Sequence, residues 1–201
     1  VSNHPMGAAD AIALYYKIYP VRNDLFFFAN ELFVYLLGSF QDLLAPVIWN
    51  KEKEIHLASK VTIERLSVFF GEERPGIIFP SGRLSKLTFF GLWDRSWEKT
   101  PIALARKYDF PLIPVYVEGR NSWFFYFASY INKQLRDVSQ LNELFNKRDK
   151  KISIKIGKPV NVRSLNDNSN IAINQLRYKS ERLRKKAILN INSFIYLRNY
   201  K

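Results

Sequence analysis

Three short apolar runs alternate along the chain with stretches of helical periodicity. The runs are Ile77–Phe79, which lies between Pro75-Gly76 and Pro80-Ser81-Gly82, then Leu112–Val117, and then Lys151–Ile156, in which Ile alternates strictly with Lys and Ser. Apolar runs of this length between turn residues predict strands, and strict alternation predicts a half-exposed strand at a sheet edge. Strands separated by helices predict an α/β fold.

Helical periodicity predicts helices over residues 8–19, 53–70 and 100–108, and a basic helix or pair of helices over residues 171–200 after a loop at 161–170. A further helix is predicted after Asp24, a residue suited to cap it, with apolar positions at Phe27, Leu32, Tyr35 and Leu36. Two very apolar pieces, Leu25–Phe28 and Trp123–Phe127, are compatible either with a core or with a surface that dips into a bilayer interface.

A length of 201 residues suits one domain. Charge is distributed unevenly along it. Residues 1–146 carry 16 basic and 15 acidic side chains, whereas residues 147–201 carry 15 basic and three acidic ones. The basic excess at the end of the chain predicts an anionic partner, such as an acidic bilayer or a phosphorylated substrate. Nucleic acid is not expected, because the first 146 residues are nearly neutral and carry no nucleic-acid-binding motif.

The chain contains no cysteine, which excludes disulfides, thiolate zinc sites and cysteine nucleophiles. No stretch reaches the roughly 18 uncharged apolar residues that a membrane span requires. The sequence begins at Val1 without an initiator Met or the basic and apolar regions of a signal peptide. We interpret the first residues as the end of a strand and expect a native N-terminus to precede them.

A histidine and a carboxylate stand close together near the start of the chain, in the segment Asn3–Asp10. His4 precedes a Pro-Met-Gly turn, and Asp10 falls in the first turn of the expected helix. A histidine that acts as a general base needs an acceptor for its second ring nitrogen, and the turn can fold the helix start back under the ring. The pair therefore predicts deprotonation of a substrate hydroxyl, although a structural His and a capping Asp would share this spacing.

A second candidate site is the loop after the strand at residues 77–79. Its residues are Pro80, Ser81, Gly82 and Arg83, with Lys86 three positions further on. A Gly-containing loop with two cations can present N–H groups and positive charge to a phosphate. A plain turn with solvated cations is the alternative.

Taken in order, these segments resemble the glycerophospholipid acyltransferase family, whose members acylate lysophospholipids and related lipid hydroxyls. The resemblance rests on the His-Asp motif in Asn3–Asp10, a Phe-Pro-Glu-Gly-type motif at Ile78–Arg83 and a Val-Pro-Val-type strand at Ile113–Val115, and it extends over about residues 2–160. Five residues separate His4 from Asp10, which matches the branch that carries His-Pro-x-Gly-x-x-Asp and is related to hemolysin-like and ornithine-lipid acyltransferases. Ser81 stands where the family usually has Glu.

The resemblance implies a glycerol-phosphate acyltransferase-like fold: a single α/β domain with a mixed central sheet flanked by helices. It implies a catalytic domain over residues 1–160, with residues 161–201 as a basic helical extension packed on it. The implied reaction moves an acyl group from acyl-CoA or an acyl carrier protein to a lipid hydroxyl. No cofactor and no metal are expected, the thioester being a co-substrate.

The resemblance also assigns roles to individual residues. His4 would be the general base and Asp10 would orient it. Asn3 and Gly7 would lie in the loop near the oxyanion. The acceptor's phosphate or carboxylate would be bound by Pro80, Ser81, Gly82, Arg83 and Lys86.

Two other functions remain open. One is a basic module that binds a membrane or nucleic acid without catalysis, through an amphipathic helix that carries Arg177, Lys179, Arg182, Arg184, Lys185 and Lys186 beside Tyr178, Leu183, Ile188 and Leu189. The other is a thioester or lipid hydrolase in which the same His–Asp pair activates water. We expect a cytoplasmic protein bound peripherally to the cytoplasmic face of an anionic membrane.

Overall fold

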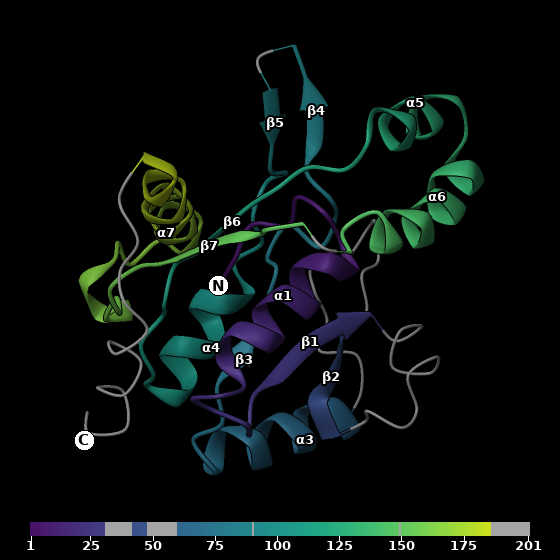
Figure 1. Ribbon diagram of the computed structural model, residues 1–201. Coiled ribbons are helices and arrows are strands. Elements are labelled where there is room, and N and C mark those ends of the chain that lie inside the picture. The colour runs from purple at the N-terminus through teal and green to yellow at the C-terminus, as the bar shows by residue number, and fades with distance from the viewer. Residues whose placement is uncertain (31–41, 48–59, 90, 149, 186–201) are drawn as a thin grey trace.

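The computed structural model describes residues 1–30, 42–47, 60–89, 91–148 and 150–185 (Figure 1). The helices of this part are α1 (Ala8–Ile18), α3 (Lys60–Gly71), α4 (Thr100–Tyr108), α5 (Trp123–Ile131), α6 (Lys133–Phe145) and α7 (Ser169–Arg182), with short 3₁₀ turns η2 (Val162–Ser164) and η3 (Leu183–Lys185). The strands are β1 (Phe26–Asn30), β2 (Leu44–Val47), β3 (Gly76–Ile77), β4 (Lys86–Thr88), β5 (Gly91–Trp93), β6 (Val115–Glu118) and β7 (Ser153–Ile156).

Strand β1 is the centre of a parallel three-stranded sheet, with β2 on one side and β3 on the other. Its aromatic side chains alternate between two cores. Phe27 packs in the cluster that includes Leu14 of α1, and Phe26 and Phe28 pack in the cluster that includes Leu66 of α3. Both faces of β1 are therefore covered by helices, as Figure 1 shows. Burying one such ring completely contributes roughly 1.5–3 kcal/mol.

The first residues of the chain connect this sheet to a second pair of strands. Ser2 N donates to Ile78 O at 3.1 Å, just after β3, and Val115 N of β6 donates to Val1 O at 2.8 Å. Ser2 thus forms a parallel bridge with Val115, while β6 pairs antiparallel with β7. The result is a mixed α/β sheet arrangement flanked by helices, as expected, with residues 1–3 running through its middle.

The prediction of a helix directly after Asp24 was wrong. Residues Phe26–Asn30 form strand β1, and the Asp24 carboxylate accepts hydrogen bonds from Arg22 at 2.8 and 2.7 Å instead of capping a helix. A continuous apolar run that is buried on both faces suits a parallel strand, and it has no periodicity to separate it from a buried helix. The core interpretation of Leu25–Phe28 is confirmed, because all four residues are at most 8% exposed. Leu32, Tyr35 and Leu36 lie outside the described residues.

Most of the other expected elements are confirmed. The helices at 8–19 and 100–108 correspond to α1 and α4, and the helix at 53–70 corresponds to α3 from Lys60 onward, residues 53–59 lying outside the described part. The strands expected at 77–79, 112–117 and 151–156 are shorter, namely β3, β6 and β7. The loop expected at 161–170 contains η2, and α7 begins at Ser169, earlier than expected. Residues 186–200 of the expected basic helix lie outside the described residues.

Helix α7 packs its apolar side on α4. Ala172, Ile173 and Leu176 are buried in the same cluster as Ile102 and Ala105. The rest of α7 is largely polar, with Ile171 and Tyr178 as its exposed apolar side chains. Within the described residues, no helix has the length and hydropathy that crossing a membrane requires.

Candidate active site

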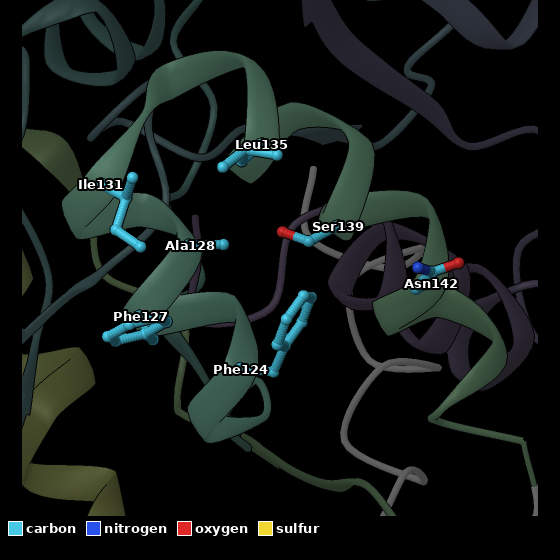
Figure 2. Close-up of a pocket in the computed structure, with 7 residues that line it drawn as sticks. All are labelled: Phe124, Phe127, Ala128, Ile131, Leu135, Ser139 and Asn142. Atoms are coloured by element: carbon cyan, nitrogen blue, oxygen red, sulfur yellow. The ribbon is translucent and has the colours of Figure 1, made fainter.

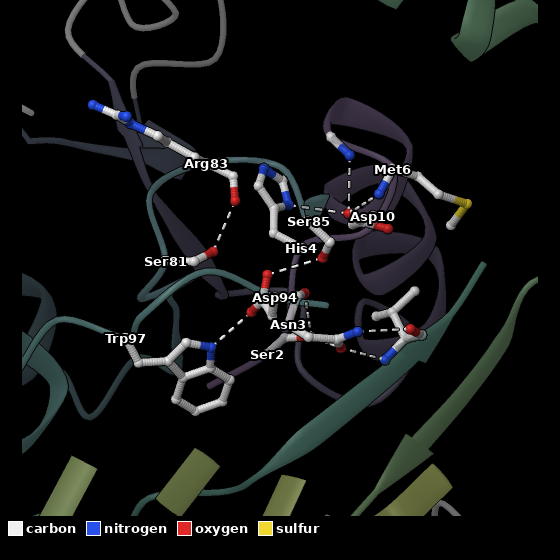
Figure 3. Close-up of polar contacts among 12 residues, drawn as sticks. Ser2, Asn3, His4, Met6, Asp10, Ser81, Arg83, Ser85, Asp94 and Trp97 are labelled. Atoms are coloured by element: carbon white, nitrogen blue, oxygen red, sulfur yellow. Dashed lines mark hydrogen bonds and ion pairs between the residues drawn. The ribbon is translucent and has the colours of Figure 1, made fainter. Parts of the chain in front are cut away.

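The site is organised around the turn that connects the N-terminal segment to α1. Asp10 is fully buried in the first turn of this helix, and its Oδ2 accepts hydrogen bonds from Met6 N at 2.8 Å and Gly7 N at 3.0 Å. Nδ1 of His4 lies 3.0 Å from the same oxygen (Figure 3). The helix start folds back under the ring, as the Pro-Met-Gly turn predicts. One ring nitrogen of His4 thus faces the Asp10 carboxylate, and the His4 side chain is 19% exposed.

Gly7 makes this turn possible. Its φ of 80° lies in the region that L-residues rarely adopt, and a Cβ there would lie 3.1 Å from Leu84 Cδ2. The N–H of Gly7 itself donates to Asp10, and the oxyanion role expected for the loop at Gly7 stays a prediction. Helix α6 reaches the same turn, since Gln140 is the nearest neighbour of Gly7 on that side.

The Asn3 side chain contacts β6. Its Nδ2 donates to Val117 O at 2.9 Å, and its Oδ1 accepts from Val117 N at 2.7 Å. The side chain is buried and takes the place of a backbone pair beside β6. Asn3 therefore fixes the strand that delivers His4, and its amide is already engaged away from any oxyanion.

The loop after β3 contributes the other wall of the site. Phe79 stacks on the His4 ring with centroids 4.2 Å apart. Ser81 is buried, and its hydroxyl donates to Arg83 O at 2.9 Å, so it stabilises the loop itself. Pro80 is buried and accepts from Glu98 N, while Gly82 adopts a φ of 56°.

Two cations of this loop face solvent. Arg83 and Lys86 are both exposed, Lys86 at the start of β4. Figure 3 draws the Arg83 backbone close to His4, with the guanidinium directed away from the His4–Asp10 pair. The structure thus brings the two motifs together at the level of the backbone, while the charged end of Arg83 points outward.

Sequence reasoning missed a second polar group beside His4, formed by Ser85, Asp94 and Trp97. Ser85 Oγ donates to Asp94 Oδ1 at 2.9 Å, and Trp97 Nε1 donates to Asp94 Oδ2 at 2.7 Å. Ser85 N also donates to His4 O at 2.8 Å. Burial raises the pKa of Asp94, and the donors Trp97 and Ser85 and the charge of His4 oppose that rise. Nothing in the composition of the segment Asp94–Thr100 indicates contact with His4.

Helices α5 and α6 form a hairpin with an apolar groove (Figure 2). The groove encloses about 190 Å³, and its lining comprises Phe124, Phe127, Ala128, Ile131, Leu135, Ser139 and Asn142. The aromatic side chains of α5 in and beside this groove are largely exposed. Its Trp123, Phe124 and Phe127 are 68%, 65% and 63% exposed, whereas Phe125 is buried. Most of the Trp123–Phe127 piece is thus surface, in contrast to Leu25–Phe28.

Glu143 of α6 connects the two helices of this hairpin at the N-terminal end of α5. Glu143 of α6 accepts from the Ser122 backbone N–H and from Lys147 Nζ, both at 2.8 Å, and from the Ser122 hydroxyl. Ser122 is the residue that caps α5. Burial alone would raise the pKa of Glu143, but the hydrogen bonds from Lys147 and Ser122 outweigh it and hold the pKa below its usual value.

Some basic residues near the end of the chain contact other parts of the protein, and others are exposed to solvent. Arg177 pairs with Glu181 at 2.8 Å and donates to Asp94 O at 2.9 Å, so it is part of the fold. Lys179, Arg182 and Arg184 are exposed, as is Tyr178, while Leu183 is buried. Lys186, Ile188 and Leu189 lie outside the described residues. The buried side of α7 is therefore occupied by the core, and its exposed side carries Lys179 and Arg182 together with Ile171 and Tyr178.

In the described part of the chain, no three His, Cys, Asp or Glu side chains gather closely enough to hold a metal ion.

Comparison with known proteins gives a consistent result. A family model described as acyltransferase matches residues 1–195. A lyso-glycine lipid O-acyltransferase of Phocaeicola vulgatus is 30% identical over 167 residues, covering 80% of this chain and 58% of that protein. The protein of the same name from Bacteroides thetaiotaomicron is 29% identical over 167 residues, with 80% and 59% covered. The chain thus spans less than two thirds of these relatives. No solved structure gives a significant match.

Proposed function

The chain belongs to the acyltransferase family, and from that premise we propose that it transfers an acyl group from an acyl thioester to a hydroxyl of a lipid acceptor. His4 is the general base in this proposal, and Asp10 orients it. The observation that carries the proposal is the 3.0 Å approach of His4 Nδ1 to Asp10 Oδ2. Because Met6 N and Gly7 N hold the carboxylate, the imidazole has a fixed orientation and a partner for its charged form.

The reaction is one proton transfer coupled to one acyl exchange. The acceptor hydroxyl gives its proton to the free ring nitrogen of His4, and its oxygen attacks the thioester carbonyl. The C–S bond then breaks, and the thiol leaves with the proton that His4 took up. The new C–O bond is an ester, so no electrons are gained or lost overall.

The donor in this proposal is acyl-CoA or an acylated acyl carrier protein. The acceptor is a lysophospholipid or a related lyso-lipid, and the lyso-glycine lipid named in the two relatives supports that class. Arg83 and Lys86 are exposed cations next to the His4 turn, which suits them to bind the acceptor's phosphate or carboxylate. Pro80, Ser81 and Gly82 act by shaping the loop that carries these cations.

A peripheral position on an anionic membrane would bring such an acceptor to the site. Two surfaces support it: the exposed aromatic face of α5 and the cationic residues Lys179, Arg182 and Arg184. Exposed aromatics suit the interfacial layer of a bilayer, and basic residues are attracted by its acidic headgroups. In this proposal the membrane is reached from its cytoplasmic face, and residues 161–201 form the basic extension of the catalytic domain.

The test is an assay of thioester consumption by the full chain, with a long-chain acyl-CoA as donor and a lyso-glycine lipid or a lysophospholipid as acceptor. We expect consumption to depend on the acceptor and an acylated lipid to appear in the same amount as free CoA. Consumption without acceptor, with free fatty acid as the product, would indicate a hydrolase and contradict the proposal.

A further inference from the structure

Asp94 lies beside the candidate base without being in the motif that contains it. It follows β5, and its carboxylate lies between the buried side chains of Ser85 and Trp97, each of which donates one hydrogen bond to it (Figure 3). Arg177 donates a hydrogen bond to the backbone carbonyl of Asp94 and not to its carboxylate. Within the described residues, the carboxylate has no ion pair with Lys or Arg.

The Asp94 carboxylate and Ser85 together hold the backbone of His4. Ser85 N donates to His4 O at 2.8 Å, while Ser85 Oγ donates to the carboxylate at 2.9 Å. Burial raises the pKa of Asp94, and hydrogen bonds from Trp97 and Ser85 and the nearby His4 oppose that rise. Ser85 is therefore fixed at both ends, by Asp94 on one side and by His4 on the other.

The position of the His4 ring is then determined from three directions. Asp10 Oδ2 lies 3.0 Å from Nδ1, Phe79 covers one face, and the Ser85–Asp94 pair holds the backbone on the side away from Asn3's anchor on Val117. The first two contacts act on the ring and cannot set where its Cα lies. A base must approach the proton that it removes to within hydrogen-bond distance, so a displaced backbone would lower the rate even with the ring contacts intact.

This placement works against stability. Because burial raises the pKa of Asp94, its contribution to folding stability is full below its usual pKa of 3.8 and is lost as the pH rises through the higher folded value. At neutral pH the ionised carboxylate is thus less favourable in the folded protein than in the unfolded one. A neutral isostere would remove that burden.

We propose that Asp94 is a positioning residue for the base: through Ser85 and the His4 backbone it fixes where the His4 imidazole meets the acceptor hydroxyl. The inference rests on the proposed acyl transfer, since it assumes that His4 is the base. It assigns no proton transfer to Asp94. Trp97 completes the arrangement by fixing the second carboxylate oxygen.

The experiment compares Asp94→Asn, Ser85→Ala and Ser85→Thr with the unchanged protein and with Asp167→Asn, a matched control at an exposed aspartate. The readouts are kcat, the KM for a long-chain acyl-CoA and the thermal unfolding midpoint. We expect Asp94→Asn to lower kcat by about 10–100-fold with an unchanged KM and an unfolding midpoint that does not fall. Ser85→Ala should lower kcat, and Ser85→Thr, which keeps the hydroxyl, should recover most of it.

A double variant tests whether the two residues act together. If Asp94 works through Ser85, the Asp94→Asn and Ser85→Ala effects on kcat are far from additive when combined. Unchanged kcat in Asp94→Asn, or a fall in kcat that is matched by a fall in the unfolding midpoint, would overturn the inference. Full activity in His4→Ala would instead overturn the proposed function, so the two failures are distinguishable.

Discussion

His4 Nδ1 and Asp10 Oδ2 lie 3.0 Å apart, although five residues separate them in the chain. The separation is bridged by a turn in which Gly7 takes a positive φ and two backbone N–H groups point at the carboxylate. The start of α1 therefore favours the charged form of the Asp10 carboxylate independently of the imidazole. An orienting carboxylate that is itself held in this way leaves the ring little freedom to turn.

Replacing His4 tests the base directly. We expect His4→Ala to lower the rate of acyl transfer by about 10²–10⁴-fold, because the acceptor hydroxyl loses the group that takes its proton. Asp10→Asn should lower kcat by orders of magnitude as well, since the amide cannot stabilise the imidazolium. The rates are measured with saturating acyl-CoA, and the unfolding midpoint is recorded for each variant.

The chain's other histidine, His56, lies outside the described residues and supplies the matched control. His56→Ala should retain the activity of the unchanged protein. Retention of most activity by His4→Ala, with a native unfolding profile, would rule out the proposed mechanism.

Arg83 is expected to act on acceptor binding. Arg83→Ala should raise the KM for an anionic acceptor and leave kcat nearly unchanged, because its contact is made in the ground state and the transition state alike. Arg83→Lys should recover only part of the affinity, since an ammonium group cannot make the paired hydrogen bonds of a guanidinium. Arg163→Ala removes an exposed arginine that pairs with Asp109 and should leave the KM as it was. An acceptor KM that is the same in Arg83→Ala and Arg83→Lys as in the parent would remove Arg83 from the site.

Glu143 should make the α5–α6 hairpin sensitive to acid. Its pKa is lowered in the folded protein, so its contribution to stability is present above its usual pKa of 4.5 and is lost as the pH falls through the lower folded value. Glu143→Gln should reduce the free energy of unfolding at neutral pH by roughly 2 kcal/mol, the worth of hydrogen bonds to a charged group. Urea unfolding between pH 3 and pH 7 measures both effects.

The control for Glu143 is Glu72→Gln. Glu72 is exposed and lies 3.9 Å from Arg74, so its pair should contribute little to stability. Equal losses of stability in the two variants, or a Glu143→Gln protein with the parent's pH dependence, would contradict the role assigned to this carboxylate.

Local signals account for what the sequence could predict. Helices α1 and α4 and the His4–Asp10 pairing depend on caps, turns and spacings that lie within about ten residues. Strand β1 was mistaken for a helix because a short apolar run has no periodicity, and its strand character comes from pairing with β2 and β3. The two hydrophobic clusters that bury the β1 side chains depend on the same distant pairing, so one sequence does not predict them.

The missed part of the site is distant in sequence. Ser85 and Asp94 reach His4 from more than eighty positions away, brought there by the loop after β3 and by the β4–β5 hairpin. The resemblance to the acyltransferase family placed Asn3 and Gly7 in the loop near the oxyanion. The Asn3 side-chain amide donates to Val117 O, and the Gly7 N–H donates to Asp10. No local sequence signal predicts these two contacts.

Membrane binding should have two separable components. The cationic component involves Arg182, Arg184, Lys185 and Lys186, each contributing on the order of 1 kcal/mol near an acidic bilayer and screened by salt. The apolar component involves the exposed α5 residues Trp123 and Phe127, whose burial in the interface does not depend on salt. Binding of the parent to anionic vesicles should therefore weaken with salt without disappearing.

Co-sedimentation with anionic and neutral vesicles over a salt series separates the two components. Replacing the four basic residues with Gln should release the protein from anionic vesicles at physiological ionic strength. Trp123→Ser with Phe127→Ser should remove the binding that persists at high salt, whereas Tyr16→Ser, at a somewhat more exposed aromatic of α1, should not. Equal binding of the parent to both vesicle types would exclude the electrostatic component. Salt-resistant binding that survives the α5 replacements would place the apolar contact elsewhere in the chain.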